Sequence, residues 1–209
     1  MILQNDCSFQ CLKAVQQFFT RKGFVITSLS EHLGKDNKTY GDAAYKLLDK
    51  DGNEKLINID FKRQMKDRDF IAIELIYVKM NGEYDGWLYN PNEHFIVYEF
   101  NNGDVFVFSH EELIGISKYF NREDVWQTCM VYTRNPNAYF NERLYISNKL
   151  NEYDDVSPIC IEGNISPSDI HINGAFNYTN YGKVHSGFCV NIPLRYAENY
   201  KVNPRIITN

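Results

Sequence analysis

The stretch Leu56–Val78, LINIDFKRQMKDRDFIAIELIYV, decides the fold of this chain. In its first half, apolar and polar residues alternate, with Ile57 and Ile59 on one side of the chain. This period of two predicts a β-strand that has one face in the core. The second half, Phe70–Val78, is apolar except for Glu74 and predicts a strand that is covered on both faces.

Charged residues on these strands form the candidate site. A carboxylate in a buried strand is costly unless a metal ion or an amine pairs with it. A further acid, Asp42, lies in the strand-like run Gly41–Leu48, which a turn around Asp51-Gly52 joins to the next strand. We expect four side chains to meet on adjacent strands of one sheet: Asp42, Asp60, Lys62 and Glu74.

The bulk composition is that of a globular protein. A chain of 209 residues can form one well-buried domain with an added subdomain. No apolar run approaches the roughly 18–20 residues of a membrane span, and the N-terminus lacks the pattern of a secretory signal. We therefore expect a cytoplasmic protein with no membrane partner.

The charge is unevenly distributed along the chain. Residues 1–80 carry 13 Lys and Arg against 11 Asp and Glu, whereas residues 81–209 carry 9 against 16. A surface that binds a polyanion is therefore expected in the N-terminal part, although a solvated surface with no such role explains the same asymmetry. The five cysteines show no zinc-binding spacing and are expected to be buried free thiols.

The remaining patterns predict an α/β fold, with a mixed central β-sheet flanked by helices and an irregular C-terminal β-rich extension. We expect residues 1–134 to form the core and residues 135–209 to form an extension packed on it. The expected elements outside the central stretch are a helix over Ser8–Lys22, a strand over Phe24–Leu29, a loop over Ser30–Tyr40, a turn-rich loop over Met80–Glu93, a hairpin of Phe95–Phe100 with Val105–Phe108, a helix over Glu111–Tyr119 and a strand over Trp126–Arg134.

The expected elements follow one another as a helix, a strand, a strand that carries Asp42 and a strand that carries the D-x-K motif Asp60-Phe61-Lys62. This order resembles the PD-(D/E)XK nuclease superfamily. The resemblance implies a restriction-endonuclease-like core in which Asp42 and Asp60 hold Mg²⁺ (or Mn²⁺). It also implies that Lys62 orients or deprotonates the attacking water during hydrolysis of DNA. The physical chemistry fits, because Mg²⁺ prefers oxygen ligands and lowers the pKa of a bound water.

The chain departs from the family pattern in several places. The residue before Asp42 is Gly41 rather than proline, and Ile76 stands where a second E-x-K would need lysine after Glu74. Glu74 is therefore expected to be an auxiliary acid of the site. A looser likeness to small phage-encoded nuclease-like proteins lies in Asp60–Lys62, Ile73-Glu74-Leu75 and Gly86-Trp87.

Under this hypothesis, basic side chains of the N-terminal part contact DNA phosphates. The acidic C-terminal portion is expected either to limit non-specific binding or to mediate self-association as a homo-oligomer. The candidate phosphate contacts are Arg63, Lys66 and Arg68, together with Lys13 and Arg21.

Structural roles explain each residue equally well. Asp60 and Lys62 could form an exposed ion pair worth less than about 1 kcal/mol, Glu74 could pair with a lysine, and Asp42 could be a turn residue. The alternative function is accordingly a non-catalytic protein, of the kind phages encode, that binds a host protein factor through its acidic, aromatic-rich C-terminal half.

Overall fold

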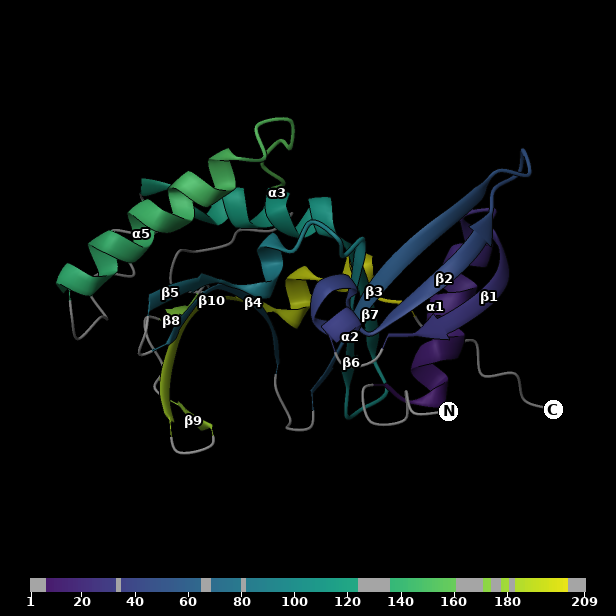
Figure 1. Cartoon of the computed structure of the whole chain (residues 1–209), viewed down its shortest axis with the longest axis horizontal. Helices are drawn as coiled ribbons and strands as arrows, with labels where there is room; N and C mark the ends of the chain where they lie inside the picture. Colours follow the sequence, from purple (N-terminus) through teal and green to yellow (C-terminus); the bar gives the residue numbers. More distant parts are fainter. Residues whose placement is uncertain are drawn as a thin grey trace. The chain divides into compact units, whose positions relative to one another are not determined.

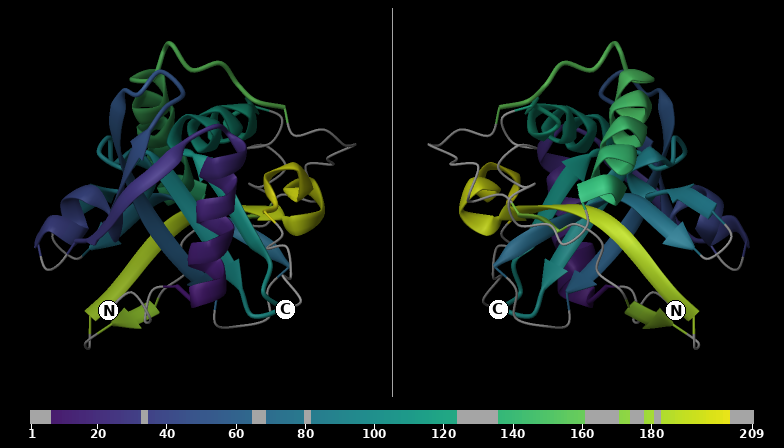
Figure 2. Two further views of the ribbon diagram at one scale, coloured as in Figure 1. Left: turned by 90° about the vertical axis from the view of Figure 1, so that its right-hand side faces the viewer. Right: turned by 90° about the vertical axis from the view of Figure 1, so that its left-hand side faces the viewer.

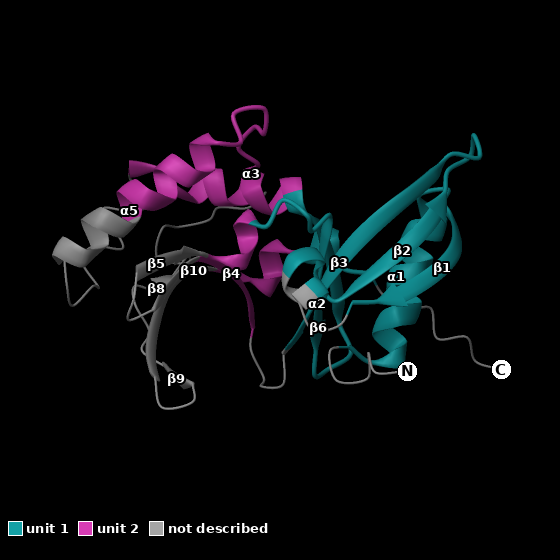
Figure 3. Cartoon of the chain, viewed as in Figure 1, with its two compact units in different colours: residues 1–68, 90–110, 198–209 teal, residues 69–89, 111–197 magenta. Residues whose placement is uncertain are grey.

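The computed structural model describes residues 7–32, 35–64, 69–79, 82–123, 136–160, 171–173, 178–180 and 183–202 (Figure 1, with two further views in Figure 2). The chain divides into two compact units that interleave in sequence (Figure 3). Unit 1 comprises residues 1–68, 90–110 and 198–209, and unit 2 comprises residues 69–89 and 111–197. This division differs from the expected boundary after residue 134.

Unit 1 is built on a five-stranded sheet with the strand order β1-β2-β3-β6-β7. Strands β3 and β6 are parallel, and all other neighbours are antiparallel. The sheet is therefore mixed, and together with its helices it confirms the expected α/β class. The strands are β1 (Val25–Glu31), β2 (Ala43–Leu48), β3 (Glu54–Gln64), β6 (Phe95–Phe100) and β7 (Val105–Ser109).

Helix α1 (Phe9–Arg21) covers one face of this sheet, which confirms the helix predicted over Ser8–Lys22 (Figure 2). Ser8 caps its N-terminus, because the Ser8 hydroxyl oxygen accepts a hydrogen bond from the Cys11 backbone N–H at 3.1 Å. The buried side of the helix packs into one apolar core with residues from four strands. That core includes Leu12, Val15, Phe19, Ala43, Tyr45, Leu47, Ile59, Val97 and Val107.

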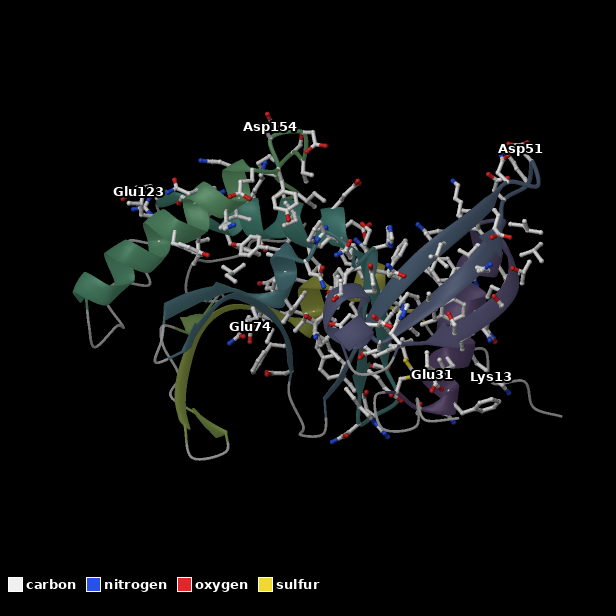
Figure 4. All side chains as sticks on the ribbon, in the orientation of Figure 1. Lys13, Glu31, Asp51, Glu74, Glu123 and Asp154 are labelled. Atoms are coloured by element: carbon white, nitrogen blue, oxygen red, sulfur yellow. The ribbon has the colours of Figure 1, made fainter. Side chains whose placement is uncertain are left out.

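Strands β2 and β3 form the predicted hairpin, with Ala43 opposite Ile59 and Leu48 opposite Glu54. The turn is stabilised by Asp49, whose Oδ1 accepts hydrogen bonds from the backbone N–H groups of Asp51 and Asn53 at 2.9 Å each. Asp51 lies at the tip of this hairpin (Figure 4). The turn residues therefore fix the register of the two strands.

A short helix, α2 (Lys35–Tyr40), replaces the loop that we expected over Ser30–Tyr40. Its six residues are mostly polar, so the segment has no apolar periodicity from which a helix could be predicted. The helix ends at Tyr40 and is followed by Gly41, whose φ of +78° is favourable for glycine and strained for other residues.

The predicted hairpin of β6 and β7 is present, with Gly103 at φ +84° in its turn. The outer edge of β7 contacts a returning segment of the chain, where the Val202 N–H donates to the Val105 carbonyl at 2.7 Å. Nearby, the ring of Tyr200 stacks on Phe108 with centroids 4.4 Å apart. Residues near 200 therefore complete the sheet of unit 1.

Unit 2 contains an antiparallel sheet with the order β5-β4-β10-β8, and β9 also pairs with β10. In β4, Ile71, Ile73 and Leu75 are buried, whereas Ala72 and Glu74 are half-buried. At these positions the strand therefore has one fully buried face rather than the two we expected. The strands are β4 (Phe70–Lys79), β5 (Gly82–Asp85), β8 (His171–Asn173), β9 (Tyr178–Asn180) and β10 (Lys183–Pro193).

The helices of unit 2 were predicted only in part. Helix α3 (His110–Phe120) confirms the one expected over Glu111–Tyr119, but the 16-residue helix α5 (Pro136–Asn151) was not predicted. The strand expected over Trp126–Arg134 lies outside the described residues. Short 3₁₀ turns comprise Trp87–Tyr89 and Leu194–Tyr196 in unit 2 and Glu198–Tyr200 in unit 1. None of the helices in the described ranges is long and apolar enough to cross a bilayer.

Candidate active site

Asp42 and Asp60 lie opposite each other because of the hairpin register. Ala43 pairs with Ile59, so continuing the antiparallel register by one residue brings Asp42 opposite Asp60. Ala43 and Ile59 face helix α1 in the apolar core, and the two acids therefore face the other side of the sheet. The two carboxyl groups are close enough for one to hydrogen-bond to the other.

The Asp42 carboxylate is fixed by backbone contacts. Its Oδ2 accepts a hydrogen bond from the Phe61 N–H at 2.7 Å, and the Asp42 N–H donates to the Ile59 carbonyl at 2.9 Å. This close approach requires Gly41, because a Cβ atom there would lie 2.8 Å from the Ile59 carbonyl oxygen. The local geometry thus explains why glycine precedes Asp42 in this chain.

Lys62 lies on the same face of β3 as Asp60, and its Nζ forms an ion pair with Asp60 Oδ2. Burial raises the pKa of Asp60 to about 6, with a further contribution from Asp42, while the charge of Lys62 opposes the shift. Burial disfavours the charged form of Lys62, but the neighbouring carboxylates outweigh it and raise the pKa of Lys62. The amine therefore stays protonated at neutral pH.

A third acid, Glu93, belongs to the same group, although the sequence analysis missed it. The residues Asp42, Asp60 and Glu93 are only 9%, 7% and 6% exposed. Burial raises the pKa of Glu93 to about 7. The negative charge of Asp60 raises this pKa further, whereas the positive charge of Lys62 lowers it. A single turn-borne glutamate carries no sequence signal, and only the pairing of β6 with β3 brings it to the site.

The turn that carries Glu93 is held by hydrogen bonds within it and to β3. Asn90 Nδ2 donates to Glu93 Oε1 at 2.7 Å, and the Glu93 N–H donates to the Asn90 carbonyl at 3.3 Å. His94 Nδ1 accepts the Asn58 N–H at 3.0 Å, while Asn58 Nδ2 donates to the Asn92 carbonyl at 2.9 Å. These contacts place Glu93 beside the Asp60 strand.

The cluster carries a net charge of −2 when its three carboxylates and the ammonium of Lys62 are all ionised. One divalent cation would neutralise it. In the described part of the chain, no three His, Cys, Asp or Glu side chains converge closely enough to hold a metal ion. The pair Asp42 and Asp60 still fits Mg²⁺, which proteins commonly bind through one or two carboxylates together with water and substrate phosphate.

Glu74 does not share a sheet with these residues, so the expectation that all four predicted residues lie on adjacent strands of one sheet is wrong. Strand β4 pairs with β5 and β10, whereas β3 pairs with β2 and β6 (Figure 4 labels Glu74). Alternation of residues predicts the faces of a strand but not its neighbours.

Gly86 packs directly on the Glu74 backbone, since a Cβ atom at Gly86 would lie 2.3 Å from the Glu74 carbonyl oxygen.

Of the predicted phosphate contacts on and after β3, the described residue Arg63 does not lie beside the acids. Arg63 lies on the face of β3 opposite Asp60, where its Nε is 3.7 Å from Glu99 Oε2. The same Glu99 oxygen accepts the Ser8 N–H at 2.7 Å at the start of helix α1. Lys66 and Arg68 lie outside the described residues.

The expectation of buried free thiols is confirmed for Cys7 and Cys11 and is wrong for Cys160. Cys7 and Cys11 are buried and unpaired by disulfide, whereas Cys160 is exposed. A hydrogen bond with Cys7, together with burial, raises the pKa of Cys11, which keeps this thiol protonated and unreactive.

Comparison with protein-family models, with curated proteins and with solved structures finds no match for this chain. Any function must therefore be argued from the cluster itself.

Proposed function

We propose that this chain is a metal-dependent DNA endonuclease that hydrolyses phosphodiester bonds. The proposal is carried by one observation: the hairpin register brings Asp42 opposite Asp60, and the Lys62 ammonium forms an ion pair with Asp60. Paired carboxylates can hold a divalent ion for metal-assisted phosphodiester hydrolysis, and an amine beside them can offset negative charge on the phosphate. The mixed sheet, with the D-x-K strand in its centre and helix α1 on one face, is compatible with a restriction-endonuclease-like core.

In the proposed site, Asp42 and Asp60 hold Mg²⁺ or Mn²⁺. When bound, the ion would lower the pKa of a coordinated water and offset negative charge on the phosphate. Lys62 donates hydrogen bonds to the attacking water and to the scissile phosphate, which fixes the direction of attack. The side chain of Lys62 is 29% exposed, so it is not fully enclosed by the protein.

DNA is the proposed substrate because the N-terminal part of the chain is the more basic one. The excess of Lys and Arg over residues 1–80 contrasts with the acidic remainder, and steering of a polyanion favours the basic part. Glu74 is left out of the proposed centre, since it belongs to unit 2 and to another sheet.

The test is a cleavage assay on duplex, single-stranded and branched DNA with Mg²⁺ or Mn²⁺. We expect Asp60→Asn and Lys62→Met to abolish cleavage while leaving the protein folded. Matched controls are Glu54→Gln and Lys46→Met, which alter an exposed ion pair on the same hairpin and should retain activity.

The absence of cleavage on every substrate, or full activity in both site variants, would contradict the nuclease proposal. The chain would then be the non-catalytic binding protein, and a pull-down should return one stoichiometric protein partner. Under that alternative the acids serve structure, as the hydrogen bond from Phe61 to Asp42 already does.

A further inference from the structure

We propose that Glu93 is a positioning residue that receives the ammonium group of Lys62 when a divalent cation engages Asp42 and Asp60. This inference rests on the proposed metal-dependent function. It assigns a role to a buried acid that is not part of the D-x-K pattern.

The first argument is the geometry of Glu93. Its Oε1 is held by Asn90 at 2.7 Å, whereas its Oε2 is buried and has no hydrogen-bond partner among the described residues. A buried carboxylate oxygen without a partner is costly, and a cation beside it would remove that cost. Glu93 and Lys62 are close enough for their charges to interact.

The second argument is the charge of the cluster. Without a metal ion, Asp60 is paired with Lys62. A divalent cation bound by Asp42 and Asp60 would neutralise both carboxylates and weaken the ion pair between Asp60 and Lys62. Glu93 is the remaining acid of the group, so pairing it with Lys62 leaves each charge compensated.

The third argument separates this role from direct metal ligation. Three carboxylates do not converge closely enough to hold an ion in the described residues, and one oxygen of Glu93 is already fixed by Asn90. Lys62 has a longer side chain and is partly exposed, so it is the group that can move.

The experiment measures Mn²⁺ affinity by titration calorimetry and by the electron paramagnetic resonance of free Mn²⁺, for the full chain at pH 8. The variants are Glu93→Gln, Lys62→Met and the double variant. In Glu93→Gln, Lys62 stays on Asp60 and competes with the ion, so the affinity should fall about tenfold, the scale of coupling between contacting charged groups. In the Lys62→Met background the competitor is absent, and Glu93→Gln should change the affinity by no more than about threefold.

An equal loss in both backgrounds would overturn the inference, because it would make Glu93 a direct ligand or a simple source of negative charge. Unchanged Mn²⁺ affinity in Glu93→Gln would also overturn the inference about Glu93. In that case the proposed function would still stand if the unmodified chain binds Mn²⁺ and cleaves DNA. Absence of Mn²⁺ binding by the unmodified chain would overturn both.

Two further variants guard against misfolding and against non-specific charge effects. Asn90→Ala keeps the carboxylate but removes the hydrogen bond that orients it, so it should give a smaller loss in the same direction. Glu54→Gln removes an exposed acid on the same hairpin and should leave Mn²⁺ affinity unchanged.

Discussion

The Asp42 carboxylate accepts the backbone N–H of Phe61 at 2.7 Å, across the hairpin that brings Asp42 opposite Asp60. An acid of the candidate site therefore also holds the register of the two strands that form the site. Structure and proposed chemistry depend on the same side chain.

Replacing Asp42 with alanine should destabilise the fold. The buried Phe61 N–H would lose its acceptor, and a hydrogen bond to a charged group contributes about 1.5–3 kcal/mol, partly offset here by relief of repulsion with Asp60. Urea unfolding at pH 7 measures the loss. Asp42→Asn keeps an acceptor oxygen and should lose less. An Asp42→Ala protein as stable as the parent would show that this bond contributes nothing.

The Asp60–Lys62 ion pair should be strongly coupled. In Lys62→Met, Asp60 remains buried without a cation, and we expect a loss of about 1–3 kcal/mol at pH 8. At pH 5 the loss should shrink, because Asp60 can take up a proton. A double-mutant cycle with Asp60→Asn measures the coupling in urea.

The matched control for this cycle is the Lys46–Glu54 pair, whose side chains are 51% and 60% exposed at a separation of 3.4 Å. Its coupling should stay below about 1 kcal/mol. Equal coupling in the two pairs would contradict the idea that burial strengthens the Asp60–Lys62 interaction.

The stability of the protein should depend on pH through Asp60 and Glu93. Their pKa values, about 6 and about 7 in the folded protein, are raised from ordinary values of 3.8 and 4.5. The folded state thus binds protons more tightly than the unfolded state does. These groups therefore stabilise the fold most when the pH is below their ordinary pKa values, and this stabilisation is lost as the pH rises through about 6 and 7.

Glu93→Gln isolates one of these contributions, since glutamine does not ionise. Relative to the parent, its free energy of unfolding should rise by about 1–3 kcal/mol between pH 5 and pH 8. Urea unfolding at several pH values gives both curves, and the effect of His94, whose pKa is lowered by burial, cancels in the difference. Parallel curves would refute the raised pKa of Glu93.

Gly41→Ala should be more disruptive than the same change at another glycine with positive φ. A Cβ atom at Gly41 would lie 2.8 Å from the Ile59 carbonyl oxygen, whereas a Cβ atom at Gly52 would meet nothing within 4 Å. Gly52→Ala should therefore cost about 1–2 kcal/mol for its backbone conformation alone. Gly41→Ala should cost about 1–3 kcal/mol more from crowding, measured by urea unfolding. Similar losses at both positions would contradict the close approach.

Local patterns predicted those parts of the fold in which neighbours in sequence are neighbours in space. The apolar spacing of α1 and the alternation in β3 follow from contacts within a few turns or across one hairpin. The turn at Asp51-Gly52 is enough to bring Asp42 opposite Asp60, which is why that pair could be found in the sequence.

The features that were missed depend on contacts between distant segments. Strands β3 and β4 follow each other in sequence but join different sheets, and no local pattern encodes the partner of a strand. Glu93 reaches the site only because β6 pairs in parallel with β3, a choice made by tertiary packing. Helix α5 contains several asparagines and has no sharp apolar stripe, so its periodicity was too weak to recognise.

Unit 1 is assembled from three separate stretches of the chain, and the last of them places Val202 against β7. During synthesis, β1, β2 and β3 emerge long before β6 and β7, and the segment that lies against the β7 edge emerges later still. The parallel β3–β6 pairing must also wait for the intervening strands of unit 2 to leave the ribosome. The nascent hairpin therefore carries Asp42 and Asp60 with an unpaired edge for much of translation, a period in which a chaperone would protect it from aggregation.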